Sequence, residues 1–100
     1  MKVKITNAAQ RRLSKIDDYY RLKGNPKGGK KLRREVVKQG QKLGKHPEMG
    51  QEEENLKHLG LGHRYLVIKP FYKLIYLIIK PVVYITDIFD TRQDPKKMKP

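Results

Sequence analysis

The chain has 100 residues, and its 24 lysines and arginines against 10 aspartates and glutamates give a formal net charge of +14. This length predicts one domain, residues 1–100, with one hydrophobic core. Because the chain has no cysteine, disulfides and thiol chemistry are excluded, which fits a reducing cytoplasm. We see no signal peptide after Met1, and the longest apolar run, residues 74–79, is too short to span a bilayer. We therefore expect a cytoplasmic protein with no membrane partner.

The positive charge is concentrated in the first half of the chain. Residues 1–50 hold 15 basic and 4 acidic side chains, whereas residues 51–100 hold 9 and 6. A strongly basic surface attracts polyanions, of which nucleic acid is the commonest in cytoplasm. Solubility alone needs a net charge of only about 2 to 8. The composition therefore favours binding to nucleic acid or to an acidic protein.

The first half predicts a short strand followed by two helices. Apolar and polar residues alternate over residues 2–6, as they do in a strand. Asn7 and Gln10 have capping-box spacing, and apolar residues then recur at helical intervals up to Tyr20. The sequence Gly24-Asn25-Pro26 ends this helix, and a second helix with a basic outer face covers about residues 28–43. A short loop joins the two, so we expect an antiparallel helix hairpin.

Three strand-like runs follow an irregular polar segment at residues 46–62. They cover about residues 63–69, 72–80 and 82–90 and are separated by the turns Lys69-Pro70-Phe71 and Lys80-Pro81. The middle run is apolar at both alternating sets of positions, which indicates a central strand covered on both faces. The helix hairpin can cover only one face, so the other needs the C-terminal tail or a partner chain. We expect residues 96–100 to be a mobile basic tail.

In this order, the predicted elements resemble the RelE/ParE superfamily, the toxins of bacterial type II toxin–antitoxin systems, also known as plasmid stabilisation proteins. The resemblance covers nearly the whole chain and is most specific at Tyr72-Lys73-Leu74-Ile75-Tyr76 and at residues 85–94. It implies an α+β, RelE-like fold with the order β-α-α-β-β-β. The helix hairpin would pack on one face of a mainly antiparallel four-stranded sheet. It also implies a cognate antitoxin whose C-terminal segment wraps the toxin and covers the second apolar face.

Members of this superfamily divide by target. ParE-like toxins inhibit DNA gyrase and are not known to hydrolyse anything, whereas RelE-like toxins enter the ribosomal A site and cleave mRNA. The resemblance therefore implies a toxin that arrests growth through an essential nucleic-acid machine, with no cofactor and no small-molecule ligand. Gyrase inhibition is favoured, and a ribosome-dependent mRNA endoribonuclease is the alternative. Outside the family, a non-toxic basic RNA-binding module is a further alternative.

Three basic residues stand where nucleases of the superfamily carry catalytic cations. Cleavage by a ribose 2′-hydroxyl needs a base, cations around the phosphate and an acid for the leaving oxygen. By position, the resemblance assigns these roles to Arg64, Lys73 and Arg92. The alternative is that Arg64 and Lys73 are solvated strand residues. Arg92 could equally pair with Asp90 or Asp94 and brace the C-terminus, and either aspartate could in principle be the base.

The chain also departs from the nuclease pattern. Residues 90–95 lack the His-Tyr pair of another ribonuclease branch, and Leu66 stands where RelE-like enzymes have a second basic residue. No tyrosine follows Tyr84. These gaps favour a ParE-like or undefined target over nuclease chemistry.

The remaining candidates concern binding to a target or to nucleic acid. Tyr65 and Tyr72 are the better candidates for exposed, base-stacking rings, whereas we expect Tyr76 and Tyr84 to pack in the core. The basic face of the second helix is a candidate phosphate-contacting surface, with a simple solvated face as the alternative. Its residues are Lys30, Lys31, Arg34 and Lys38, and Asp90 and Asp94 complete the set of candidate binding residues. The three histidines match no metal-site spacing, so we expect no metal; they are His46, His58 and His63.

Overall fold

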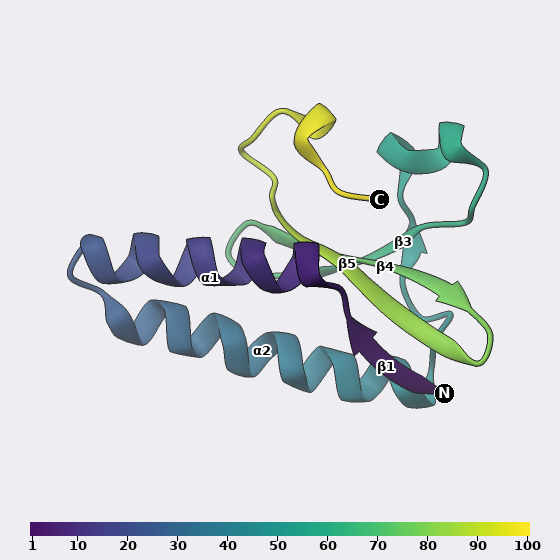
Figure 1. Ribbon diagram of the computed structural model, residues 1–100, viewed down its shortest axis with the longest axis horizontal. Helices are drawn as coiled ribbons and strands as arrows, with labels where there is room; N and C mark the ends of the chain where they lie inside the picture. The colour runs from purple at the N-terminus through teal and green to yellow at the C-terminus, as the bar shows by residue number, and fades with distance from the viewer.

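A five-stranded sheet and a helix hairpin make up the computed structural model, which describes residues 1–100 (Figure 1). The strands lie in the order β1-β5-β4-β3-β2, and β1 pairs parallel with β5 while all other neighbours are antiparallel. The strands are β1 (Lys2–Ile5), β2 (Gln51–Glu52), β3 (Arg64–Ile68), β4 (Tyr72–Ile79) and β5 (Val82–Asp90). The helices are α1 (Asn7–Leu22), α2 (Pro26–Lys45) and two short 3-10 helices, η1 (Glu54–Leu59) and η2 (Pro95–Lys97). Neither long helix has the length and hydrophobicity to cross a membrane.

The α+β architecture and the mainly antiparallel sheet are confirmed, but the sheet has five strands where the sequence predicted four. The extra strand, β2, is two residues long and lies in the segment predicted to be irregular. Both of its residues are exposed, so no alternation of apolar and polar side chains marks it. Pairing with β3 alone defines this strand, and that pairing depends on the completed fold.

Both long helices begin at polar caps. The Thr6 side chain accepts a hydrogen bond from the Ala9 backbone N–H at 3.1 Å, so the cap lies one residue before the predicted Asn7. The Asn25 side chain accepts one from the Gly28 N–H at 3.2 Å, and Pro26 is the first residue of α2. The second helix therefore begins two residues earlier than residue 28, because Asn25 acts as its cap.

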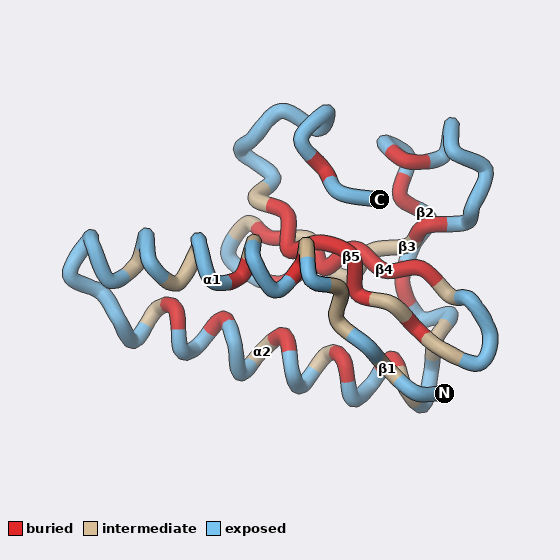
Figure 2. The backbone as a smooth tube through the Cα atoms, viewed as in Figure 1, coloured by how far each residue is buried: buried red, intermediate tan, exposed pale blue.

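The helix hairpin covers one face of the sheet, and the main core lies between them. In Figure 2 the buried positions of α2 lie on the side that faces α1 and the sheet. Tyr76 is fully buried there, as predicted, and its hydroxyl accepts a hydrogen bond from the Gly50 N–H at 2.9 Å. Burial of each large apolar side chain stabilises the fold by ~1.5–3 kcal/mol. The core includes Ala9, Leu13, Leu32, Val36, Leu43, Leu74, Val83, Ile85 and Ile88.

The second face of the sheet is covered by the chain itself. Ile75 and Phe89 from the central strands pack with Leu56 of η1 and with Met98, which is only 5% exposed. Of the two coverings that the sequence left open, the C-terminal tail is therefore the one in the structure, together with η1. The antitoxin is not needed to cover this face. The tail predicted to be mobile is docked, because a buried methionine anchors it.

A β-bulge in β5 provides a contact for the docked tail. Opposite β4, the pairs Ile75–Asp87 and Tyr76–Ile85 leave Thr86 without a partner in the ladder. The Thr86 hydroxyl lies 3.2 Å from the carbonyl oxygen of Lys99, to which it donates a hydrogen bond. Pairing with β1 stops at Ile85, so β5 beyond the bulge is open to contact with α1 and the tail.

Candidate functional site

The predicted catalytic cations do not converge on one point. Arg64 lies opposite Tyr76 in the β3–β4 ladder, on the helix face, and its guanidinium donates to the Gly50 carbonyl oxygen at 2.8 Å. Lys73 lies opposite Phe89 in the β4–β5 ladder, so its side chain belongs to the second face. Side chains on opposite faces of a sheet cannot surround one phosphate.

Lys73 forms an internal ion pair. Its ammonium lies 2.9 Å from the Glu53 carboxylate, which is 1% exposed and also accepts two hydrogen bonds from Asn55. The same ammonium lies 4.2 Å from the centroid of the Tyr65 ring. Tyr65 also donates its hydroxyl hydrogen to Gln51 at 3.2 Å. Lys73 and Tyr65 thus brace the segment around η1 against the sheet, and one face of the Tyr65 ring is occupied.

Arg92 pairs with Asp90. Its guanidinium binds both carboxylate oxygens, at 3.1 and 2.8 Å, and its backbone N–H adds a third hydrogen bond at 2.9 Å. These bonds hold the pKa of Asp90 below its usual range and raise the pKa of Arg92. The guanidinium also stacks on the Phe71 ring, 3.6 Å from its centroid. Asp94 forms no ion pair with Arg92, and its carboxylate caps η2 by accepting from the Lys96 N–H at 3.0 Å.

Tyr72 is buried, so the prediction that its ring is exposed is wrong. It lies opposite Asp90 on the helix face and is only 4% exposed. Its hydroxyl oxygen lies 3.3 Å from that of Tyr20 on α1, and its ring packs against Phe71. Burial, with the Tyr20 hydrogen bond, raises the pKa of Tyr72. This ring cannot stack on a base without disrupting the contact between α1 and the sheet.

The basic face of α2 is exposed. None of its four candidate cations takes part in an ion pair or a side-chain hydrogen bond, so their charge is available to a ligand. They are Lys30, Lys31, Arg34 and Lys38. Their role in binding a target stays a prediction.

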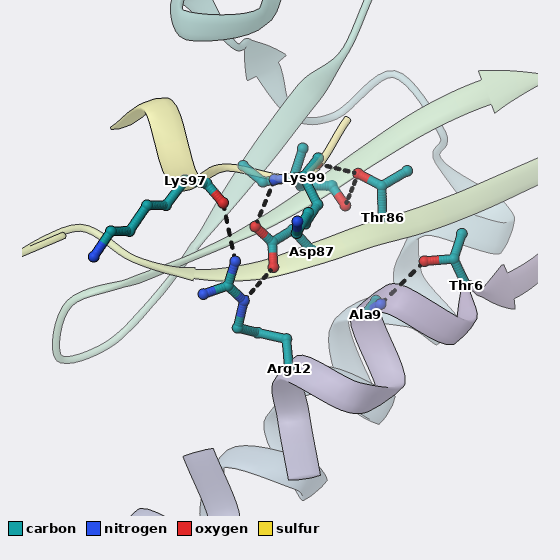
Figure 3. A network of polar contacts seen from close by, with 8 residues as sticks. Thr6, Ala9, Arg12, Thr86, Asp87, Lys97 and Lys99 are labelled. Atoms are coloured by element: carbon teal, nitrogen blue, oxygen red, sulfur yellow. Dashed lines mark hydrogen bonds and ion pairs between the residues drawn. The ribbon is translucent and has the colours of Figure 1, made fainter. Parts of the chain in front are cut away.

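A buried ionic network that the sequence did not reveal joins α1, β5 and the tail (Figure 3). Arg12 donates to the Asp87 carboxylate at 3.1 Å and to the Lys97 carbonyl oxygen at 3.0 Å. The Lys99 N–H donates to the other Asp87 oxygen at 2.9 Å, and the Asp87 residue is 0% exposed. Burial raises the pKa of Asp87, while the hydrogen bonds and the Arg12 charge oppose that rise. A charged residue inside the apolar stretch of residues 85–89 was the available signal, but its partner lies 75 residues away.

The three histidines do not come together as a metal site. No cluster of three potential ligands lies close enough to hold a metal ion. His63 is 2% exposed, and neither of its ring nitrogens has a hydrogen-bond partner. Desolvation lowers the pKa of this imidazole.

Comparison with known proteins decides the family. The family model described as the ParE toxin of the type II toxin–antitoxin system parDE matches residues 3–95. This chain belongs to the ParE toxin family. A solved structure of the chromosomal ParDE toxin–antitoxin system from P. aeruginosa superimposes with a TM-score of 0.72 at 22% sequence identity. The alignment covers 90% of this chain and 95% of that chain, and at this identity it shows the shared fold. No curated protein matches the chain in sequence.

The family also implies a partner. A ParE toxin is one component of a toxin–antitoxin system, so an antitoxin is its expected partner. The resemblance to the RelE/ParE superfamily is thereby confirmed.

This ParE-family toxin has an apolar groove of about 670 Å³ between β1 and α2. Val37 and Met1 are 61% and 44% exposed there, although both are apolar. The strand β1 is an edge of the sheet, so its outer backbone groups have no strand partner. The groove is lined by Met1, Val3, Ile5, Val36, Val37, Gly40, Gln41, Gly44, Lys45 and Ile85.

Proposed function

We propose that this ParE-family toxin arrests growth by binding an essential nucleic-acid machine, DNA gyrase, without cutting RNA. The separation of Arg64 and Lys73 on opposite faces of the sheet is the observation that carries this proposal. Phosphodiester cleavage needs cations, base and acid around one phosphate. Each candidate cation is instead engaged within the chain, Arg64 with Gly50, Lys73 with Glu53 and Arg92 with Asp90. A toxin that acts by binding needs only a complementary surface.

The charge of the molecule supports a target that works on nucleic acid. The net charge of +14 steers the toxin toward polyanionic surroundings, such as a machine with DNA bound to it. The four unpaired cations of α2 add an exposed surface that a target could contact. A non-toxic RNA-binding module would share this charge, but the family match supports the toxin.

A cognate antitoxin neutralises the toxin by occupying the apolar groove. The second face of the sheet is already covered by the tail and η1, whereas the groove gathers exposed apolar side chains into a hollow that a partner could fill. A partner segment with apolar side chains would cover Val37 and Met1 and lie alongside the free edge of β1. Burial of that surface would supply affinity.

The experiment is a supercoiling assay with purified gyrase, the purified toxin and the antitoxin encoded beside it. The toxin should reduce supercoiling, and equimolar antitoxin should restore it. A toxin that arrests growth on induction but leaves gyrase unaffected would exclude gyrase as the target. Normal growth at high levels of soluble protein would contradict the toxin function itself in that host.

A further inference from the structure

The docked tail and α1 form the walls of a second hollow, which we name the cationic trough. Two adjoining cavities of about 370 and 380 Å³ share Arg12, Lys15 and Lys97 as lining residues. Residues from α1 line one side, and residues 92–99 line the other. The two cavities are lined by six cationic side chains: Arg11, Arg12, Lys15, Arg92, Lys97 and Lys99.

Little negative charge opposes these cations. Asp90 is the one carboxylate among the lining residues, and it is bound by Arg92. Asp87 lies beneath, fully buried, where Arg12 and the Lys99 N–H occupy its oxygens. The side chains of Arg11, Lys15 and Lys99 take part in no hydrogen bond or ion pair. The trough therefore has an unneutralised positive field, which its concave walls concentrate.

The buried network fixes the geometry of the trough. Arg12 bridges α1 to the tail through the Lys97 carbonyl oxygen, and Met98 anchors the tail on the sheet. Figure 3 shows how Arg12 and Asp87 hold the backbone of residues 97–99 over β5. Arg11 and Lys15 are four residues apart in α1, which places their side chains on one side of the helix. The backbone segments that carry the cations are thus held in place before any ligand arrives.

We propose that the cationic trough binds the sugar–phosphate backbone of nucleic acid. Arginines and lysines that converge from two walls match a chain of phosphates, which arginine can bind through paired N–H donors. Tyr19 lies at the same hollow and is 51% exposed, so its ring offers a stacking surface for an unpaired base. The part of the trough around Arg11 has only one apolar lining residue, so an acidic peptide would find little to bury its side chains. This proposal does not depend on which machine the toxin inhibits.

The test compares two variants of the full-length protein that lose the same charge. The trough variant carries Arg11→Gln, Lys15→Gln and Lys99→Gln, and the control carries Lys30→Gln, Lys31→Gln and Lys38→Gln on α2. Binding of a labelled single-stranded oligonucleotide and of the matching duplex is followed by fluorescence anisotropy over a series of salt concentrations. We expect the trough variant to bind about tenfold or more weakly, with the salt slope of log affinity reduced by about 3, one for each phosphate contact. The control should keep most of the affinity and the slope.

Three results would overturn the proposal. Equal weakening of both variants would mean diffuse attraction to the whole basic surface. Absence of oligonucleotide binding by the wild-type protein at low salt would mean that there is no such site. Displacement of the oligonucleotide by polyglutamate at equal charge concentration would identify an acidic protein segment as the ligand.

A measurement on the wild-type protein tests the proposal even if a variant fails to fold. Lysine acetylation is followed by mass spectrometry with and without bound oligonucleotide. We expect protection of Lys15 and Lys97 and no protection of Lys31. Protection of Lys31 alone would move the site to α2 and contradict the proposal.

Discussion

The cationic trough and the apolar groove differ in whether a distant segment of the chain packs against them. The trough is built from segments distant in sequence, since α1 is joined to β5 and the tail by Arg12 and Asp87. Six cationic side chains line it, together with the half-exposed ring of Tyr19. The groove between β1 and α2 has no such covering segment, and Val37 is left 61% exposed.

This difference suggests a division of labour in one small toxin. Exposed apolar surface next to a free strand edge suits a protein partner that can bury it. Unpaired cations on a fixed frame suit a polyanion, whose affinity depends on charge and salt. If the division holds, substitutions in one hollow should leave the other function intact.

The largest effect is expected from Val37→Glu in the groove. A carboxylate buried against the antitoxin without a partner should weaken the complex about a hundredfold, or ~3 kcal/mol. Calorimetric titration with the antitoxin measures this loss, and growth arrest should then escape rescue. Val67→Glu is the matched control, because Val67 is 64% exposed and lies outside the groove. Equal losses in both variants would show that the groove is not the antitoxin site.

Arg12→Ala should destabilise the fold, because Arg12 joins α1 to β5 and the tail beneath the trough. It leaves the Asp87 carboxylate buried with one partner fewer, which should lower the free energy of unfolding by ~3 kcal/mol. Urea denaturation measures this loss. Amide exchange should also show early opening at Lys99, whose N–H is bonded to Asp87. The adjacent Arg11→Ala removes a side chain that makes no hydrogen bond or ion pair, and it should change stability by less than ~0.5 kcal/mol. A similar loss in this variant would contradict a special role for the Arg12–Asp87 pair.

A smaller effect concerns His63, which is buried immediately before β3 and whose carbonyl oxygen accepts from the Glu53 N–H at 2.9 Å. Because desolvation lowers its pKa, the folded state binds its proton less readily than the unfolded state does. The stability that the neutral imidazole contributes should be complete above the unfolded pKa of about 6.5 and be lost as pH falls through the lowered folded pKa. Unfolding measured over this range should show the slope, and His63→Phe should flatten it. If the free energy of unfolding depends on pH equally in the variant, another titrating group causes the effect.

The smallest effect is expected at the edge of the trough, from Arg92→Lys. Losing the paired guanidinium contacts should return the pKa of Asp90 toward its ordinary value, since Arg92 is the main cause of its lowering. In the wild type, the contribution of this pair should persist above the unfolded pKa of about 3.9 and be lost as pH falls through the lowered folded pKa. NMR titration of the Asp90 carboxyl carbon measures its pKa in the wild type and in the variant. If the pKa of Asp90 stays as low in the variant as in the wild type, Arg92 does not brace the C-terminus.

The regular elements were predictable from the sequence because local patterns specify them. The run predicted at residues 72–80 is β4, Tyr72–Ile79, and that predicted at residues 82–90 coincides with β5. Proline-containing turns and alternation of β-rich residues mark these strands. Similarly, Pro26 and the stripe of apolar residues in α2 mark the second helix to within two residues at each end.

The site was less predictable because distant segments build it. The docking of the tail depends on Met98 reaching Ile75 and Phe89, and on Arg12 reaching Asp87. A basic C-terminal segment has the same composition whether it is docked or free. Tyr72 was expected to be exposed because it follows a turn, whereas its partner Tyr20 lies 52 residues away. Charge and periodicity cannot reveal such pairs.

The claim that this toxin acts by binding is tested most directly by primer extension on cellular mRNA after induction. We predict full-length extension products, because Arg64 and Lys73 lie on opposite faces of the sheet and no shared phosphate site joins them. Cuts that appear at codon-spaced positions within minutes of induction, and that vanish on co-expression of the antitoxin, would contradict it. They would establish the toxin as a ribosome-dependent endoribonuclease.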